Sequence, residues 1–147
     1  MKVSNNEYSR MVKNATPNSN LLSDCIRAFI AGGLICVAGQ LICDGFLAAG
    51  LKKDDASALT GAVLILAGAL LTGIGVYDKM ASLGKAGTLV PITGFANSIV
   101  SPAMEYKTEG LVPGVGTKMF TIAGPVIVYG ISASVIYGFV YKLLGGM

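Results

Sequence analysis

Long apolar runs that carry almost no charge constrain this chain more than any other feature of its sequence. The run from about Ala58 to Val76 contains no charged residue, and similar runs extend from about Cys25 to Ala49 and from about Lys118 to Tyr141. About 20 apolar residues in a helix cross the roughly 30 Å hydrocarbon core of a bilayer. Charged residues make up only 13% of the chain, which is too few to cover a soluble surface. The sequence therefore predicts a small all-α integral membrane protein.

A polar segment, residues 1–20, precedes these runs. Ser4 followed by Glu7 fits a capping box, and Tyr8, Met11 and Val12 provide a short apolar face. This pattern predicts a short helix that lies on the membrane surface. Residues 21–147 are predicted to form a single transmembrane domain.

A further apolar segment, from about Ala86 to Met104, is interrupted by Pro91 and Pro102. Because proline has no N–H, Pro102 would leave the carbonyl of Ser98 without its helical donor. Backbone oxygens freed at membrane depth are tolerated only where protein or a water-filled cavity satisfies them. We expect this segment to be the third of about four transmembrane helices, broken by its prolines.

Polar residues recur every four positions along this third segment. On a helix, steps of four drift by roughly 40° each, so the residues form one slowly winding stripe. We hypothesise that the stripe lines a polar path or binding site at the centre of the bundle. The residues assigned to this path are Thr93, Asn97, Ser98, Ser101, Glu105, Lys107 and Glu109. For the last three, the alternative is an interfacial loop in which the charges simply contact water.

Two polar residues four apart, Gln40 and Asp44, lie within the first predicted span. A charged side chain inside a membrane is a functional-site hypothesis by default. Both residues are therefore candidates for the same polar path. The alternative is that Asp44 marks the far membrane interface, one turn before Gly50.

Small residues form two stripes that predict where helices pack. Lipid tails are as apolar as leucine, so helices associate in a bilayer by close packing at small residues. One stripe is in the second span and the other is in the last. Their members are Gly61, Gly68 and Gly75, and Gly130, Ser134 and Gly138.

Several function classes are not supported by the residues present. The chain has no histidine, so a zinc site or a Ser–His pair cannot be built from it alone. It also has no basic cluster with interleaved aromatic residues, which nucleic-acid binding would favour. We expect no enzyme activity, no metal site, no cofactor and no nucleic-acid partner.

The distribution of Lys and Arg predicts the orientation in the membrane. Four crossings would place seven of the 11 Lys and Arg on the side of the N-terminus and four on the other side. Cytoplasmic loops carry an excess of these residues, so both termini are predicted to be cytoplasmic. A re-entrant third segment would instead move the C-terminus to the other side.

The third segment also carries a family resemblance. The stretch from Gly87 to Ser98, GTLVPITGFANS, is similar to the signature of the stage V sporulation A membrane proteins. Ser101–Glu105, Glu109–Gly110 and Ala123–Pro125 continue the resemblance, and the stretch from Ala28 to Cys36 resembles the family's first span. The polar tail and the length resemble the AC type of this family more than the AE type.

The resemblance implies a location and a cargo that the residue spacing does not. Family members reside in the inner membrane of the forespore and spore, where they act with sister proteins of the family. It implies a channel or transporter subunit for dipicolinic acid, carried as its calcium chelate, during sporulation and germination. We also expect an oligomer or a complex with sister proteins, since four helices are too few to enclose a wide pore. The alternative function is a non-conducting scaffold that assembles those proteins.

Overall fold

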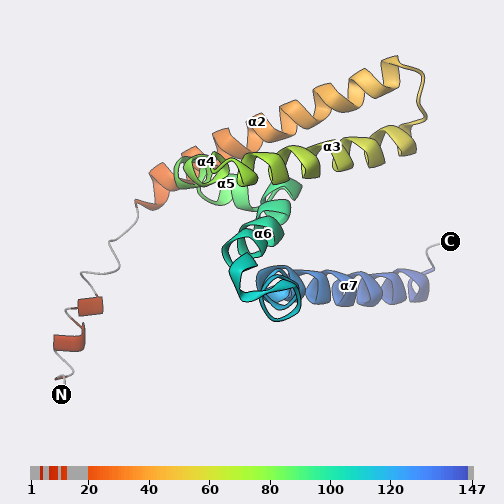
Figure 1. Ribbon diagram of the computed structural model, residues 1–147. Coiled ribbons are helices and arrows are strands. Elements are labelled where there is room, and N and C mark those ends of the chain that lie inside the picture. The colour runs from red at the N-terminus through yellow and green to blue at the C-terminus, as the bar shows by residue number, and fades with distance from the viewer. Residues whose placement is uncertain (1–3, 5–6, 10, 13–19, 146–147) are drawn as a thin grey trace.

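The computed structural model describes residues 4, 7–9, 11–12 and 20–145, and every regular element among them is helical (Figure 1). The elements are α2 (Leu21–Ala48), α3 (Lys53–Gly73), α4 (Tyr77–Gly84), α5 (Ala86–Leu89), α6 (Ile92–Glu105), the 3₁₀ turn η1 (Lys107–Glu109), the π-helical turn η2 (Leu111–Gly116) and α7 (Phe120–Leu143). Within the described residues, three stretches are long and apolar enough to cross a membrane: α2, α3 and the stretch Leu111–Leu143 that ends in α7. The predicted all-α membrane fold is confirmed.

Only part of the predicted N-terminal surface helix lies within the described residues. Residues 7–9 and 11–12 are helical. The amide nitrogen of Ser4 lies 3.5 Å from Oε2 of Glu7, which is the contact that a capping box makes at a helix start. Residues 1–3, 5–6, 10 and 13–19 of the tail lie outside the described residues.

Helices α2 and α3 form an antiparallel hairpin (Figure 1). At 28 residues, α2 is about 42 Å long, which exceeds the roughly 30 Å hydrocarbon core. Gly50 ends it with a φ of +89°, and the amide of Leu51 donates to the carbonyl of Phe46 at 3.2 Å, as in a Schellman motif. Helix α3 begins five residues before the predicted span, because Asp54 and Asp55 in its first turn favour the positive end of the helix dipole.

The third predicted span is not one crossing helix, and this corrects the expectation of about four spans. The stretch 86–104 is divided into α5, with four residues, and α6, with 14. Pro91 separates the two helices, whereas Pro102 lies inside α6 and does not end it.

The segment from α4 to α6 leaves α3 and returns to the same end of it. Three residues separate the end of α3 at Gly73 from Tyr77, where α4 begins. Further along the chain, Ser101 and Met104 of α6 line a groove together with Gly75 and Asp78. Because both ends of the segment meet at the C-terminal end of α3, the segment is re-entrant rather than transmembrane.

A re-entrant segment changes the expected topology and strengthens its charge bias. Three crossings put Lys52, Lys53 and Lys142 on one side of the membrane and the other eight Lys and Arg on the side of the N-terminus. An eight-to-three split favours a cytoplasmic N-terminus more strongly than the seven-to-four split of four crossings. Three crossings would place the two termini on opposite sides of the membrane, which is the re-entrant alternative given in the sequence analysis.

This topology is testable with reporter fusions. Alkaline phosphatase, which is active only outside the cytoplasm, should be active when fused after Leu144 and inactive when fused after Lys79. A fluorescent protein that matures only in the cytoplasm should give the reverse pattern. Cytoplasmic signals at both positions would contradict three crossings and restore the four-span topology.

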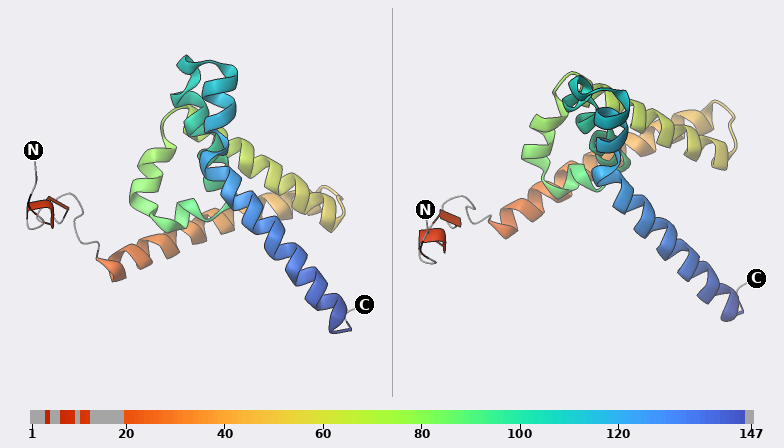
Figure 2. Two further views of the ribbon diagram at one scale, coloured as in Figure 1. Left: turned by 90° about the horizontal axis from the view of Figure 1, so that it is seen from below. Right: turned by 60° about the horizontal axis from the view of Figure 1, so that its bottom comes forward.

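Helix α7 extends away from the rest of the molecule. Its principal contact is with α6, and Ala123, near its start, is its only buried residue. Figure 2 shows α7 diverging from the α2–α3 hairpin in both views. Nearly the whole surface of α7 is therefore open to lipid or to another polypeptide.

Candidate functional site

The polar stripe of α6 faces α3, and the two helices make the most extensive contact between any two elements. Thr93, the first residue of the stripe, is 7% exposed and packs against Gly68. A Cβ atom at Gly68 would lie 2.9 Å from the carbonyl oxygen of Thr93. Glycine is therefore required for the two backbones to approach this closely.

One turn further along, Asn97 meets Thr72 of α3. The Thr72 hydroxyl lies 2.8 Å from the carbonyl oxygen of Gly68 and 2.9 Å from Oδ1 of Asn97. A hydroxyl has one hydrogen to donate, so only one of these acceptors receives it. The oxygen and nitrogen of an amide side chain are told apart only by their hydrogen bonds. With the Asn97 amide turned so that its nitrogen faces Thr72, that nitrogen donates to the Thr72 hydroxyl, and the hydroxyl donates to the Gly68 carbonyl. Thr72 and Asn97 thus join α3 to α6 through polar atoms.

Beyond Asn97 the seam between α3 and α6 opens into a groove of about 390 Å³. Thr72, Asp78 and Ser101 provide hydroxyl and carboxylate groups along it, and Met104 contributes to its apolar wall. The volume is within the range of small-molecule sites, roughly 300–1,000 Å³. We call this the seam groove; it is the polar cavity into which the predicted stripe leads.

Tyr77 completes the polar contacts of the seam and was not among the site residues predicted from the sequence. The side chain is 1% exposed, and its hydroxyl lies 2.6 Å from the carbonyl oxygen of Thr88. The same hydroxyl lies 3.0 Å from Oγ1 of Thr93. Tyr77 therefore donates to Thr88 and accepts from Thr93, which fixes α4 to both α5 and α6.

The other residues of the predicted stripe lie outside the seam. Ser98 is half-buried and donates to the carbonyl of Phe95 at 2.7 Å, which satisfies its hydroxyl within α6. Glu105, Lys107 and Glu109 are exposed, at the end of α6 and in η1. None of these three residues lines the seam groove.

Gln40 and Asp44 are not brought to the seam. The Gln40 amide donates to Asp44 Oδ1 at 2.8 Å, and both side chains lie on an exposed face of α2. Asp44 is four residues from the end of α2, as expected if it marks the far interface. The pair faces away from α6 within this chain.

The predicted packing glycines have different roles. Gly68 packs at the seam, whereas Gly75 has a φ of +71° and follows α3 as a cap residue. Gly61 has open space where a side chain would be. On α7, Gly130 and Gly138 also have open space, and Ser134 donates to the Gly130 carbonyl at 2.8 Å. The second stripe therefore packs against none of the residues that the structure describes.

The site offers the dipoles of hydroxyl and amide groups and one carboxylate, that of Asp78. No group of three or more potential metal ligands occurs among the described residues. The hydroxyls and the amide of the seam can solvate a polar cargo without binding it tightly. The fold and the site together define a multi-pass helical membrane protein with a polar re-entrant segment.

The chain belongs to the SpoVAC/SpoVAEB family of sporulation membrane proteins, whose family model matches residues 24–140. It is 46% identical over 134 residues to Stage V sporulation protein AC of Bacillus subtilis (strain 168), an alignment that covers 90% of this chain and 89% of that protein. No solved structure matches the chain. The family predicted from the signature around Pro91 is confirmed.

Proposed function

We propose that this protein is a membrane channel or transporter subunit for dipicolinic acid, carried as its calcium chelate. It would act in the inner membrane of the forespore and spore, in uptake during sporulation and in release at germination. Family membership supports the sporulation role. The observation that carries the transport role is the polar seam, where Asn97 and Thr72 meet inside an otherwise apolar molecule and lead into the seam groove.

The chemistry of the seam suits a cargo with little net charge. Dipicolinate is a planar dianion, and its one-to-one complex with calcium is nearly neutral. The hydroxyls of Thr72 and Ser101 and the amide of Asn97 supply dipoles that can replace water around such a complex. Asp78 in the seam groove would repel the free dianion but attract the calcium of the chelate. Selection for the chelate over the free acid follows from this single carboxylate.

The seam is closed in a single chain, so transport requires either movement or other chains. Gly68 and Thr93 are in close contact, which leaves no passage past the groove's inner end. Movement of α6 relative to α3 would open this contact. The open surface of α7 suits assembly with further copies or with sister stage V sporulation A proteins. We expect the complete path to lie between chains.

A matched pair of threonines tests the transport role. Thr60 and Thr72 are both buried on α3, and each donates to the carbonyl four residues earlier at 2.8 Å. Only Thr72 also contacts Asn97 and lines the seam groove. Thr72→Val should therefore lower spore dipicolinate content several-fold, while Thr60→Val should leave it unchanged.

The measurement is dipicolinate released from purified spores by boiling, normalised to equal amounts of each variant in the spore membrane. Asp78→Asn should also change the calcium requirement for uptake, whereas Glu109→Gln, on an exposed turn, should not. Normal content in the Thr72→Val variant would remove the seam from the path. An equal loss in Thr60→Val would show that the effect is structural.

A second candidate function is a non-conducting scaffold that assembles the sister proteins. The specific observation in its favour is that α7 has almost no partner within the chain, as expected for a docking helix. Liposomes containing only this protein discriminate the two. Release of trapped calcium dipicolinate, reduced by Thr72→Val, supports a conducting subunit. No release from these liposomes supports the scaffold if, in a separate experiment, the protein retains its sister proteins in the membrane.

A further inference from the structure

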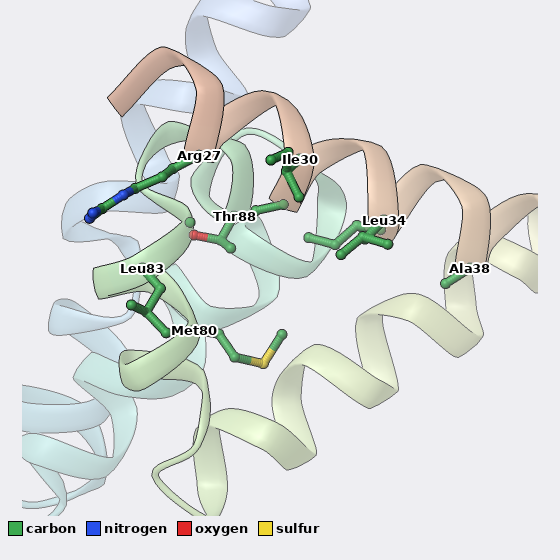
Figure 3. Close-up of a pocket in the computed structure, with 10 residues that line it drawn as sticks. Arg27, Ile30, Leu34, Ala38, Met80, Leu83 and Thr88 are labelled. Atoms are coloured by element: carbon green, nitrogen blue, oxygen red, sulfur yellow. The ribbon is translucent and has the colours of Figure 1, made fainter. Parts of the chain in front are cut away.

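A second, apolar groove lies on the opposite side of the re-entrant segment, between α2 and α4 (Figure 3). Its cavity volume is about 500 Å³. One wall is the face of α2 from Arg27 to Ala38, and the other is formed by Met80 and Leu83 of α4, with Thr88 of α5 at the base. We call it the α2–α4 groove. It is distinct from the seam groove and shares no residue with it.

The dimensions of this groove match one lipid leaflet. Arg27 and Ala38 are 11 residues apart, which is about 16 Å along a helix. Half of the roughly 30 Å hydrocarbon core is about 15 Å. Leu34, in the middle of the wall, is 65% exposed, so the groove is open at its side to the bilayer. A hydrocarbon chain that ran the length of the groove would reach from the interface to the membrane centre.

Charge is confined to one end of the groove. Arg27 lies there and extends away from the apolar wall in Figure 3. It forms no ion pair with any residue that the structure describes. Lys79 and Lys85 are exposed on and just after α4, and the acidic residues in the first turns of α2 and α4 are Asp24 and Asp78. The cations therefore outnumber the acids, and they lie on the side that the eight-to-three charge split assigns to the cytoplasm.

We propose that the α2–α4 groove binds an anionic phospholipid, with one acyl chain along the apolar wall and the phosphate against Arg27. The apolar lining recognises the chain by burial, and the unpaired guanidinium recognises the headgroup. Arginine suits this role because its planar fork can donate two hydrogen bonds to phosphate oxygens. Basic pockets between membrane helices on the cytoplasmic side bind anionic headgroups in the same way. This inference is independent of the proposed transport function.

The chain contains no tryptophan, which permits a direct test. A single Leu34→Trp substitution puts one fluorophore in the groove, and Val135→Trp puts one on the exposed surface of α7. Each full-length variant is reconstituted in phosphatidylcholine vesicles that contain increasing fractions of brominated phosphatidylglycerol or brominated phosphatidylcholine. Bromine quenches tryptophan on contact, so the quenching curves give the relative affinity of each position for the two lipids.

The expected result for Leu34→Trp is about a fivefold preference for phosphatidylglycerol, the factor that one basic residue near a membrane surface contributes. Val135→Trp should show no preference. Adding Arg27→Gln should abolish the preference at position 34, while Arg27→Lys should retain part of it. The Arg27→Gln variant keeps a long polar side chain at position 27, so folding is preserved.

Three outcomes would overturn the proposal. Equal quenching by both lipids at position 34 would mean that the headgroup is not recognised. A preference that survives Arg27→Gln would assign the recognition to other residues. Weak quenching by both lipids at position 34, with strong quenching at position 135, would mean that protein, such as a second copy, covers the groove.

Discussion

Replacing Gly87 by alanine is expected to prevent α5 from packing on α2. Gly87 of α5 lies directly on the backbone of Ala28, and a Cβ at position 87 would overlap the Ala28 carbonyl oxygen and lie 2.7 Å from its carbonyl carbon. Relief of this overlap requires a shift of helical backbone rather than of a single side chain, because Gly87 and Ala28 are both in helices. Overpacking typically costs roughly 1–3 kcal/mol and sometimes more. Since this clash is with backbone rather than with a flexible side chain, we expect a cost at the upper end of that range or above it.

The measurement is the thermal unfolding midpoint of the purified protein in detergent, followed by circular dichroism. Gly33→Ala is the matched control. Gly33 lies on α2, the helix against which α5 packs, and a Cβ added there has no atom within 4 Å. The Gly87 variant should unfold at a clearly lower temperature or fail to accumulate, while the Gly33 variant should match the wild type. Equal midpoints in the two variants would mean that α5 does not dock on α2 as described.

The sequence could predict the class of fold because hydropathy measures what a membrane helix requires. The uncharged run in α3 and the long runs in α2 and α7 were predicted as spans and are observed as helices of that kind. The re-entrant segment was predicted as a fourth span, because residues 86–104 form a mainly apolar run that carries no charge. The segment is re-entrant because Pro91 breaks it and α6 packs back along α3. That packing joins residues far apart in the sequence, so local composition does not indicate it.

The candidate site was predictable on one helix but not on its partners. The four-residue recurrence of Thr93, Asn97 and Ser101 identified the polar face of α6 correctly, since that periodicity is local. Thr72 and Tyr77 were missed as polar partners because nothing local indicates which face of α3 or α4 meets α6. Tyrosines at the ends of spans are usually interfacial, so the position of Tyr77 at the end of the uncharged run gave no sign of a buried role.

The charged end of the stripe shows where periodicity stops being informative. Glu105 and Glu109 continue the four-residue spacing, yet α6 ends at Glu105 and the chain turns into η1. Beyond that point a helical spacing no longer describes a common face. Nearby, the Lys118 ammonium lies 4.5 Å from the centre of the Tyr106 ring, a cation–π contact that joins the start of the last apolar stretch to the end of α6.

Tyr77→Phe is expected to destabilise the re-entrant segment although it removes only one oxygen atom. The substitution leaves the buried ring in place and removes the donor to the Thr88 carbonyl and the acceptor for the Thr93 hydroxyl. A buried polar group left without its partner costs roughly 1–3 kcal/mol. We therefore expect a loss of about 2 kcal/mol, measured as a lower unfolding midpoint in detergent. Tyr129→Phe is the control, because Tyr129 is 76% exposed on α7 and should lose nothing.

A double-mutant cycle with Thr93→Val separates the hydrogen bond from packing. Thr93→Val alone removes one partner of Tyr77, but in the Tyr77→Phe background the Thr93 hydroxyl has already lost that partner. Replacing both partners of a hydrogen bond by apolar groups of similar shape costs less than removing one. The cost of Thr93→Val should therefore shrink in the Tyr77→Phe background, with an interaction energy of about 0.5–3 kcal/mol. Strictly additive costs would mean that the two hydroxyls do not interact, and α4 would then be held to α6 by apolar packing alone.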